Sequence, residues 1–167
     1  MSKEVKFMKV LIVLFLFSSL AYGHGNEDHD ESELTHTNQK TQLDQTKIVL
    51  IKNKYEKDIE PIFKVSCFDC HTNQTKFPWY YKIPGIKQWM NHHIEEAKEH
   101  LDMTQGYPFK GHGDLLKDLE EIKEVIEEDE MPMWSYTLMH SEAKLTKKQK
   151  EAIYTWVKMG MRILSEK

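Results

Sequence analysis

Two cysteines and a histidine form the most chemically specific motif in this chain. The run Cys67-Phe68-Asp69-Cys70-His71 has the CxxCH spacing that is typical of covalent haem attachment. Two thiols three positions apart on one helical turn can each add across a haem vinyl group, and the histidine that follows is carried under the iron as the proximal ligand. The motif therefore predicts one haem c per chain, attached through Cys67 and Cys70, with His71 as an axial iron ligand.

The cysteine pair has two alternative interpretations. Cys67 and Cys70 are the only cysteines in the 167 residues, so the chain lacks the thiols for a four-thiolate zinc or iron–sulfur site. A structural disulfide or a thioredoxin-like redox pair would use the same two residues. A redox CxxC normally follows a buried strand, whereas residues 55–64 have the pattern of a polar, amphipathic helix. The context favours haem.

The N-terminus has the pattern of an export signal. Lys3, Lys6 and Lys9 precede an apolar stretch at residues 10–21, and Ala21-Tyr22-Gly23 offers small residues at a cleavage site, with either Met1 or Met8 as the start. The stretch is shorter than the roughly 20 residues that span a bilayer, so a cleaved signal peptide at 1–23 is favoured over an uncleaved anchor. Cleavage predicts a periplasmic protein without stable membrane insertion, which agrees with haem attachment outside the bacterial cytoplasmic membrane by the cytochrome c maturation machinery.

The remainder divides into a linker and one domain. Residues 24–44 are rich in histidine, acidic residues and amides and poor in large apolar residues, which predicts a disordered linker; a metal-binding tail is the alternative. Residues 45–167 are long enough for one haem-binding domain. Removal of three lysines and one glutamate with the signal leaves the chain more acidic than its full-length net charge of −4, which disfavours nucleic acid as a partner and suits a basic redox partner protein.

The apolar spacing of this domain is helical and shows no alternating strands. We expect a loop at residues 76–85, a helix at 87–101, a second glycine-rich loop, a helix that begins after Asp114 and ends before Met131-Pro132, and a last helix with a capping box at Thr146. The last helix should bury Ile153, Trp156 and Val157. The fold predicted is a small all-α, cytochrome c-like domain of four to five helices around one haem.

The function depends on the sixth iron ligand. Iron held by histidine and methionine suits electron transfer, whereas an open face suits catalysis or gas binding. Met131 is the first candidate, because it follows an acidic helix end and precedes Pro132, which forces a turn; simple core filling is its alternative role. His93 is the rival ligand and would give bis-histidine iron of lower potential. His140 follows an aromatic segment and is a candidate for contact with the haem edge.

These motifs together resemble the bacterial haem-binding domain family, a group of small, exported, cytochrome c-like proteins. The resemblance runs from about residue 53 to 159 and implies a helical haem protein whose pocket includes Trp79, Tyr80, Trp89, Tyr136 and His140. It departs from the family pattern at Ala97-Lys98, which replaces Gly-Arg, and at Met133, which replaces a second proline. The matching residues are Cys67–His71, Thr72-Asn73, Thr75, Pro78-Trp79-Tyr80, Trp89, His93-Ile94, Met131-Pro132, Tyr136, His140, Ala143 and Leu145-Thr146.

The sequence supports two hypotheses for the function, one an electron carrier and the other an enzyme or sensor. The first is a periplasmic monohaem carrier that passes electrons to redox partner proteins through iron ligated by His71 and Met131, without bond chemistry. The second is a haem enzyme or a redox or gas sensor, in which the distal face is open or holds His93 as an acid–base group. The carrier is favoured because the late Met-Pro loop resembles that of soluble cytochromes c. An accessory protein with a structural haem is a third possibility.

Overall fold

The computed structural model describes residues 44–111 and 113–166, and these form an all-α domain. No β-strand occurs within these residues; Asp102 and Lys110 form an isolated antiparallel bridge. The predicted signal peptide at 1–23 and nearly all of the predicted linker lie outside the described residues. Within the described part, no helix is both long enough and apolar enough to cross a bilayer.

The domain begins with a continuous helical stretch that supplies one wall of the core. Residues 44–54 are α-helical, a π-helical segment η1 follows at Tyr55–Ile59, and α2 covers Glu60–Ser66. Ile51, Tyr55, Ile59 and Phe63 recur at every fourth position and are all buried. Side chains four residues apart lie on one helical face, so this spacing gives the segment a single apolar stripe.

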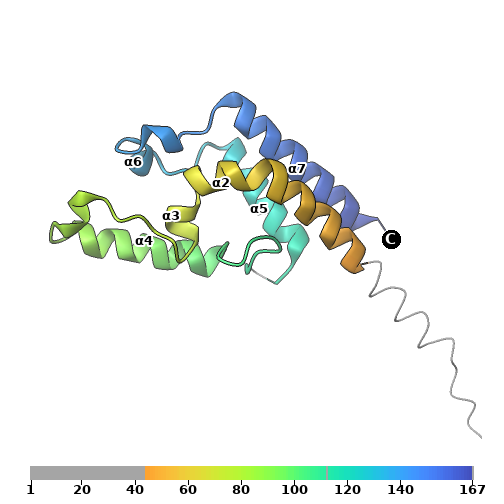
Figure 1. The fold of residues 1–167 in the computed structure, drawn as a ribbon, viewed down its shortest axis with the longest axis horizontal. Helices are drawn as coiled ribbons and strands as arrows, with labels where there is room; N and C mark the ends of the chain where they lie inside the picture. Colours follow the sequence, from red (N-terminus) through yellow and green to blue (C-terminus); the bar gives the residue numbers. More distant parts are fainter. Residues whose placement is uncertain (1–43, 112, 167) are drawn as a thin grey trace, which may run out of the picture.

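Two capped helices complete the core. Helix α5 (Leu115–Glu127) begins at Asp114, whose side chain accepts a hydrogen bond from the Leu116 N–H, and α7 (Lys147–Ser165) begins with the predicted capping box at Thr146. They pack side by side against the N-terminal stretch (Figure 1). Gly160 permits the close approach, because a Cβ there would lie 2.7 Å from Leu119 Cδ1 and 3.4 Å from Ile51 Cγ2.

An aromatic cluster fills the space between these helices. Trp156 is fully buried, and its indole N–H donates to the Ile51 carbonyl at 3.2 Å. Ring centroids in the cluster are 5.2–6.4 Å apart, and most pairs meet edge to face, as aromatic quadrupoles favour. The cluster comprises Tyr55, Phe63, Tyr107, Phe109 and Trp156.

The other half of the domain is built from short elements around α4. Helix α3 (Phe68–His71) packs on α4 (Ile86–His100), and a 3₁₀ turn η2 (Trp79–Lys82) precedes α4. Helix α6 (Trp134–Thr137) and the 3₁₀ turn η3 (Ser141–Ala143) lie on the opposite side of α3 from α4 (Figure 1). No residue of η2 or α6 is buried, so these elements do not extend the apolar core.

The predicted all-α class is confirmed. The helices predicted at 87–101, after Asp114 and after Thr146 are present, and Ile153, Trp156 and Val157 are buried as expected. The described residues contain six named α-helices, α2–α7, rather than four to five. The difference arises because α3 and α6 are single turns of four residues, too short to give an apolar periodicity.

Candidate haem site

The CxxCH run forms one tight turn between two helices. Cys67 ends α2 and precedes α3, and its carbonyl accepts hydrogen bonds from the Cys70 N–H at 3.1 Å and the His71 N–H at 3.0 Å. Buried Thr72 closes the turn, since its hydroxyl donates to the Phe68 carbonyl at 2.7 Å. The turn therefore presents both thiols and the imidazole from a short, internally bonded piece of backbone.

The imidazole of His71 is held from behind by the end of α4. Its Nδ1 lies 2.8 Å from the Leu101 carbonyl oxygen, which can only accept, so Nδ1 carries the proton. The His71 carbonyl accepts from the Met103 N–H at 2.8 Å, which fixes the backbone of the same residue. Burial lowers the pKa of His71. A neutral ring with Nδ1 bonded to a carbonyl leaves Nε2 as a lone-pair donor, the form in which histidine binds metal.

The two thiols differ from those of a reactive redox pair. Both cysteines are free, and burial, with a smaller contribution from Cys70, raises the pKa of Cys67 to about 12. Burial and the Asp69 carboxylate raise the pKa of Cys70. Cysteines of redox CxxC motifs have a lowered pKa that maintains the thiolate. The electrostatics of this turn oppose that role.

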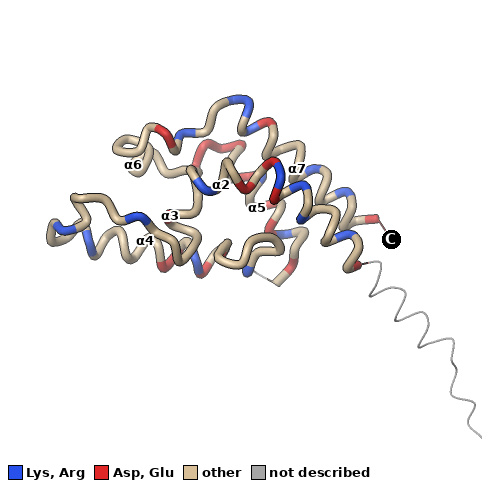
Figure 2. Tube along the Cα trace, viewed as in Figure 1, with Lys and Arg blue, Asp and Glu red and all other residues tan. Residues whose placement is uncertain are grey.

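A cavity of about 300 Å³ opens beside Cys70 between α4, the η2 loop and α6. Its walls are mainly aromatic and aliphatic, with a few polar groups at the edge, which is the usual character of a cofactor pocket. The segment 131–139, which forms one wall, carries no charged residue and is tan throughout in Figure 2. The lining residues are Asp69, Cys70, Thr75, Lys76, Pro78, Trp79, Tyr80, Ile83, Ile86, Trp89, Met90, His93, Ile94, Met133, Ser135, Tyr136 and Met139.

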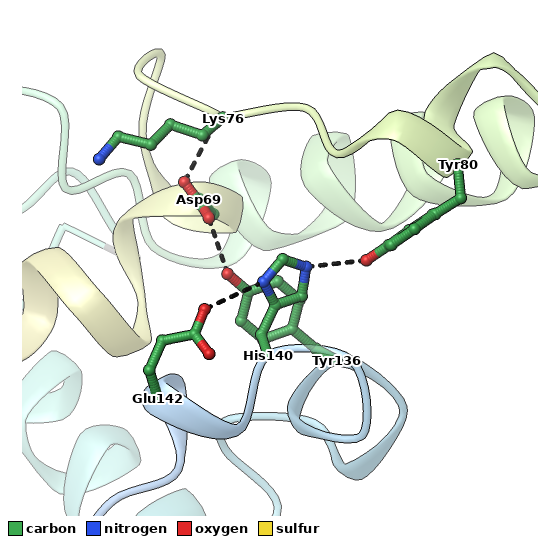
Figure 3. A network of polar contacts seen from close by, with 6 residues as sticks. All are labelled: Asp69, Lys76, Tyr80, Tyr136, His140 and Glu142. Carbon is green, nitrogen blue, oxygen red and sulfur yellow. Dashed lines mark hydrogen bonds and ion pairs between the residues drawn. The ribbon is translucent and has the colours of Figure 1, made fainter.

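Most of the predicted pocket residues meet at this cavity. Trp79, Tyr80, Trp89 and Tyr136 line it. His140 does not line the cavity but contacts two residues that do. Its Nε2 is 2.8 Å from the Tyr80 hydroxyl, and its ring stacks on that of Tyr136 with the centroids 4.4 Å apart (Figure 3). These positions are compatible with the pocket role predicted for the four lining residues and with an indirect role for His140.

The two methionines beside Pro132 face different surroundings. Met131 packs against the apolar core and is not among the cavity-lining residues, whereas Met133 lines the cavity at the start of α6. The sequence favoured Met131 as the iron ligand, but it did not predict that the two side chains face different surroundings. The structure thus adds Met133 as a cavity residue and leaves Met131 two positions away from it.

His93 reaches the cavity from α4. Its Nδ1 lies 3.3 Å from Glu96 Oε2, and the Trp89 ring meets it edge to face at 4.5 Å. A carboxylate on Nδ1 leaves Nε2 as the lone-pair nitrogen, the arrangement found when a carboxylate orients a metal-bound histidine. His92 also pairs with Glu96, at 3.2 Å, but it is more exposed and does not line the cavity.

The donor set fits a haem better than a bare metal ion. Within the described residues, no group of three or more His, Cys, Asp or Glu side chains is placed to hold an ion. The turn instead offers two thiols and one imidazole nitrogen, which are the groups that a covalently bound porphyrin requires. Cys70 lines the apolar cavity, whereas Cys67 and His71, on the same turn, are not among its lining residues. Sequence reasoning missed Asp69 and the Leu101 carbonyl as parts of this site.

The fold and the site define a small helical haem-binding protein. The chain belongs to the haem-binding domain family, which it matches over residues 32–159. It is also 29% identical over 93 residues to the cytochrome c peroxidase Ccp of Escherichia coli (strain K12), a match that covers 54% of this chain and 20% of that protein. The chain thus corresponds to about a fifth of that relative. No solved structure matches it.

Proposed function

We propose that this chain is an exported monohaem c-type cytochrome that carries electrons. One haem c would be attached through Cys67 and Cys70, with His71 as the proximal ligand. When bound, the haem supplies a reversible one-electron couple. The protein's task is then to hold both axial ligands and to keep water from the iron, since iron ligated by histidine and methionine has a raised potential and low reactivity.

One observation carries the proposal: His71 Nδ1 is 2.8 Å from the Leu101 carbonyl oxygen. This bond fixes the tautomer and directs the lone pair of Nε2 away from α4's end. A carbonyl behind a ligating imidazole raises its basicity and fixes the ring. The cavity at Cys70 supplies an apolar surface for a porphyrin face.

For the sixth ligand we propose Met131. The family pattern that the sequence resembles has proline where this chain has Met133, and proline cannot ligate iron, so the position shared across the pattern is 131. Met131 is half-buried at the edge of the core, two residues from the cavity wall. Its thioether would turn from the core toward the cavity when the haem is bound, which a flexible methionine side chain allows.

A second candidate function is a haem enzyme or sensor with an open or His93-ligated distal face. It is favoured by the cavity position of His93, by the Glu96 carboxylate 3.3 Å from its Nδ1, and by the likeness to a protein named as a peroxidase. A histidine over an open iron could move a proton during bond chemistry. The two functions differ in whether the distal face is closed.

The cellular setting is part of the same proposal. The N-terminal pattern predicts export to the periplasm through a cleavable signal, where the cytochrome c maturation machinery attaches the haem. Redox partner proteins would then exchange electrons with the haem edge.

Redox titration and peroxide turnover, measured on one preparation of exported holoprotein, separate the two functions. For a carrier we expect a single reversible one-electron wave and slow binding of cyanide and carbon monoxide. Its rate of peroxide turnover should not exceed that of free haem. Peroxide turnover that is lost in His93→Gln and retained in His92→Gln would overturn the carrier in favour of the enzyme. His92→Gln is the matched control, because it removes the neighbouring histidine that shares Glu96 but does not line the cavity.

A further inference from the structure

Asp69, inside the CxxCH run, bonds two of the elements that enclose the cavity. Its Oδ1 accepts from the Lys76 N–H at 3.1 Å, and its Oδ2 accepts from the Tyr136 hydroxyl at 2.7 Å (Figure 3). The first bond holds the start of the η2 loop. The second joins the haem-attachment turn to α6, 67 residues further along the chain.

Tyr136 connects this carboxylate directly to the segment that carries the methionines. Its backbone N–H donates to the Met133 carbonyl at 3.0 Å. The path from the attachment turn to the methionine segment therefore runs through one side chain and one backbone hydrogen bond. Burial, followed by the bond to Asp69, raises the pKa of Tyr136, so its hydroxyl stays protonated and acts as a donor.

A second branch holds the same segment against the η2 loop. The His140 ring stacks on Tyr136 with an interplanar angle of 15°, and its Nε2 bonds the Tyr80 hydroxyl. Its Nδ1 lies 3.3 Å from Glu142 Oε1, which can only accept, so Nδ1 donates to this carboxylate and Nε2 is left to pair with the Tyr80 hydroxyl. Asp69 therefore holds α6 directly through Tyr136, and Tyr80 holds it indirectly through the His140 ring that stacks on Tyr136.

The apolar core does little to fix α6. None of its residues is buried, and Trp134 and Leu138 project into solvent. Hydrogen bonds to a charged acceptor are among the stronger polar contacts in proteins. The orientation of α6 over the cavity therefore depends mainly on the network rather than on packing.

We propose that Tyr136 is a positioning residue that holds the 131–136 segment over the haem face, through its bond to Asp69, and so sets the strength of the iron's sixth bond. This inference rests on the proposed function, because it presumes an iron ligand on that segment. Loss of the Tyr136 hydroxyl would let the segment move away from the iron. The sixth ligand would then yield more easily to an added ligand, while the thioether bonds stayed intact.

The test compares Tyr136→Phe with Tyr81→Phe in exported holoprotein. Both changes remove only a hydroxyl, and Tyr81 donates its own to Asn91 Oδ1 at 2.8 Å, so it bonds α4 and not α6. We expect Tyr136→Phe to keep full haem loading, bind cyanide at least about tenfold more tightly, and shift the reduction potential, because a charge-assisted bond is lost. The cyanide affinity of Tyr81→Phe should stay within about twofold of that of the unaltered protein, because Tyr81 lies outside the network.

Two further variants keep the test decisive if Tyr136→Phe folds poorly. Asp69→Asn retains an acceptor oxygen for the Tyr136 hydroxyl and should keep most of the unaltered cyanide affinity. Asp69→Ala, which also loses the bond from the Lys76 N–H, should bind cyanide at least as tightly as Tyr136→Phe. Equal cyanide affinity and potential in Tyr136→Phe and Tyr81→Phe would overturn the inference. So would an unaltered protein that already binds cyanide as readily as Tyr136→Phe. Failure of the proposed function is distinct, since it appears as absence of covalent haem or as peroxide turnover in the unaltered chain.

Discussion

The four tryptophans of the chain divide the domain into two regions built in different ways. Trp156 is 0% exposed at the centre of the aromatic cluster, whereas Trp79 and Trp89, which line the cavity, are 74% and 45% exposed, and Trp134, on α6, is 79% exposed. An exposed tryptophan taken singly needs no explanation, but two that line one apolar cavity indicate a binding site. The first region holds itself together by apolar packing, and the second has the apolar surface that a cofactor would cover.

The two regions also differ in what fixes their elements. Capped helices with long apolar stripes form the core, and Gly160 allows them to approach closely. Two of the cavity walls, the η2 loop and α6, contain only single turns and are held by hydrogen bonds between side chains of distant segments. Changes in the first region should therefore alter stability, and changes in the second should alter the properties of the iron.

The largest effect is expected from His71→Ala, which removes the proposed proximal nitrogen from the attachment turn. The low-spin haem spectrum should be lost, and the melting temperature of the holoprotein should fall, because the haem would no longer hold α3 against the opposite wall. Loss of a metal ligand should cost more than the roughly 10–100-fold in metal affinity that follows the loss of a residue hydrogen-bonded to a ligand. Visible spectra and thermal unfolding of the holoprotein provide the measurement. An unchanged spectrum and melting temperature would show that His71 is not the axial ligand.

Trp156→Ala should be the most damaging change to stability in the core region. Truncation of a buried tryptophan costs about 3–5 kcal/mol of unfolding free energy. The folded fraction should keep the unaltered visible spectrum, because Trp156 is not among the cavity-lining residues. Denaturant titration followed by circular dichroism and by haem absorbance tests both parts. A large spectral change in the folded protein would mean that the two regions are not separable.

Met131→Ala should open the iron without unfolding the chain. The weak absorption band at the red end of the visible spectrum, which accompanies sulfur–iron bonding, should disappear, and the reduction potential should fall. Exogenous cyanide and carbon monoxide should bind readily, because a coordination site is vacated.

Met133→Ala is the control for this change, since it removes the neighbouring thioether that lines the cavity. It should leave the band intact. Loss of the band in Met133→Ala but not in Met131→Ala would transfer the ligand role to the cavity-lining methionine. Opening of the iron by His93→Ala alone would establish bis-histidine ligation instead.

The smallest effect is expected from Trp134→Ala, the counterpart of Trp156→Ala on the exposed surface of α6. Because Trp134 neither lines the cavity nor enters the core, its loss should change the unfolding free energy by no more than about 0.5 kcal/mol. Denaturant titration beside Trp156→Ala gives the comparison. A cost similar to that of Trp156→Ala would show that α6 contributes to the core.

The sequence predicted those features that depend on local spacing. Cys67, Cys70 and His71 form the expected turn, Asp114 and Thr146 cap the expected helices, and the apolar stripe of α7 is buried. Each of these rests on residues within one or two helical turns of each other. Local rules of capping and periodicity are sufficient for them.

The remaining features join residues that are far apart in the chain. The Leu101 carbonyl lies 30 residues from His71, and Tyr136 lies 67 residues from Asp69. No spacing rule links such pairs, because their contact depends on how α3, α4 and α6 pack. The different surroundings of Met131 and Met133 likewise depend on the path of the chain around Pro132.

Covalent attachment of haem to the CxxCH turn is the central claim. Exported holoprotein should be extracted with acidified acetone and its mass measured intact. The haem should stay with the polypeptide, the mass should exceed that of the processed chain by one haem, and replacement of both Cys67 and Cys70 by serine should abolish the excess. Release of free haem into the solvent by the unaltered protein, or a processed chain without added mass, would contradict the account.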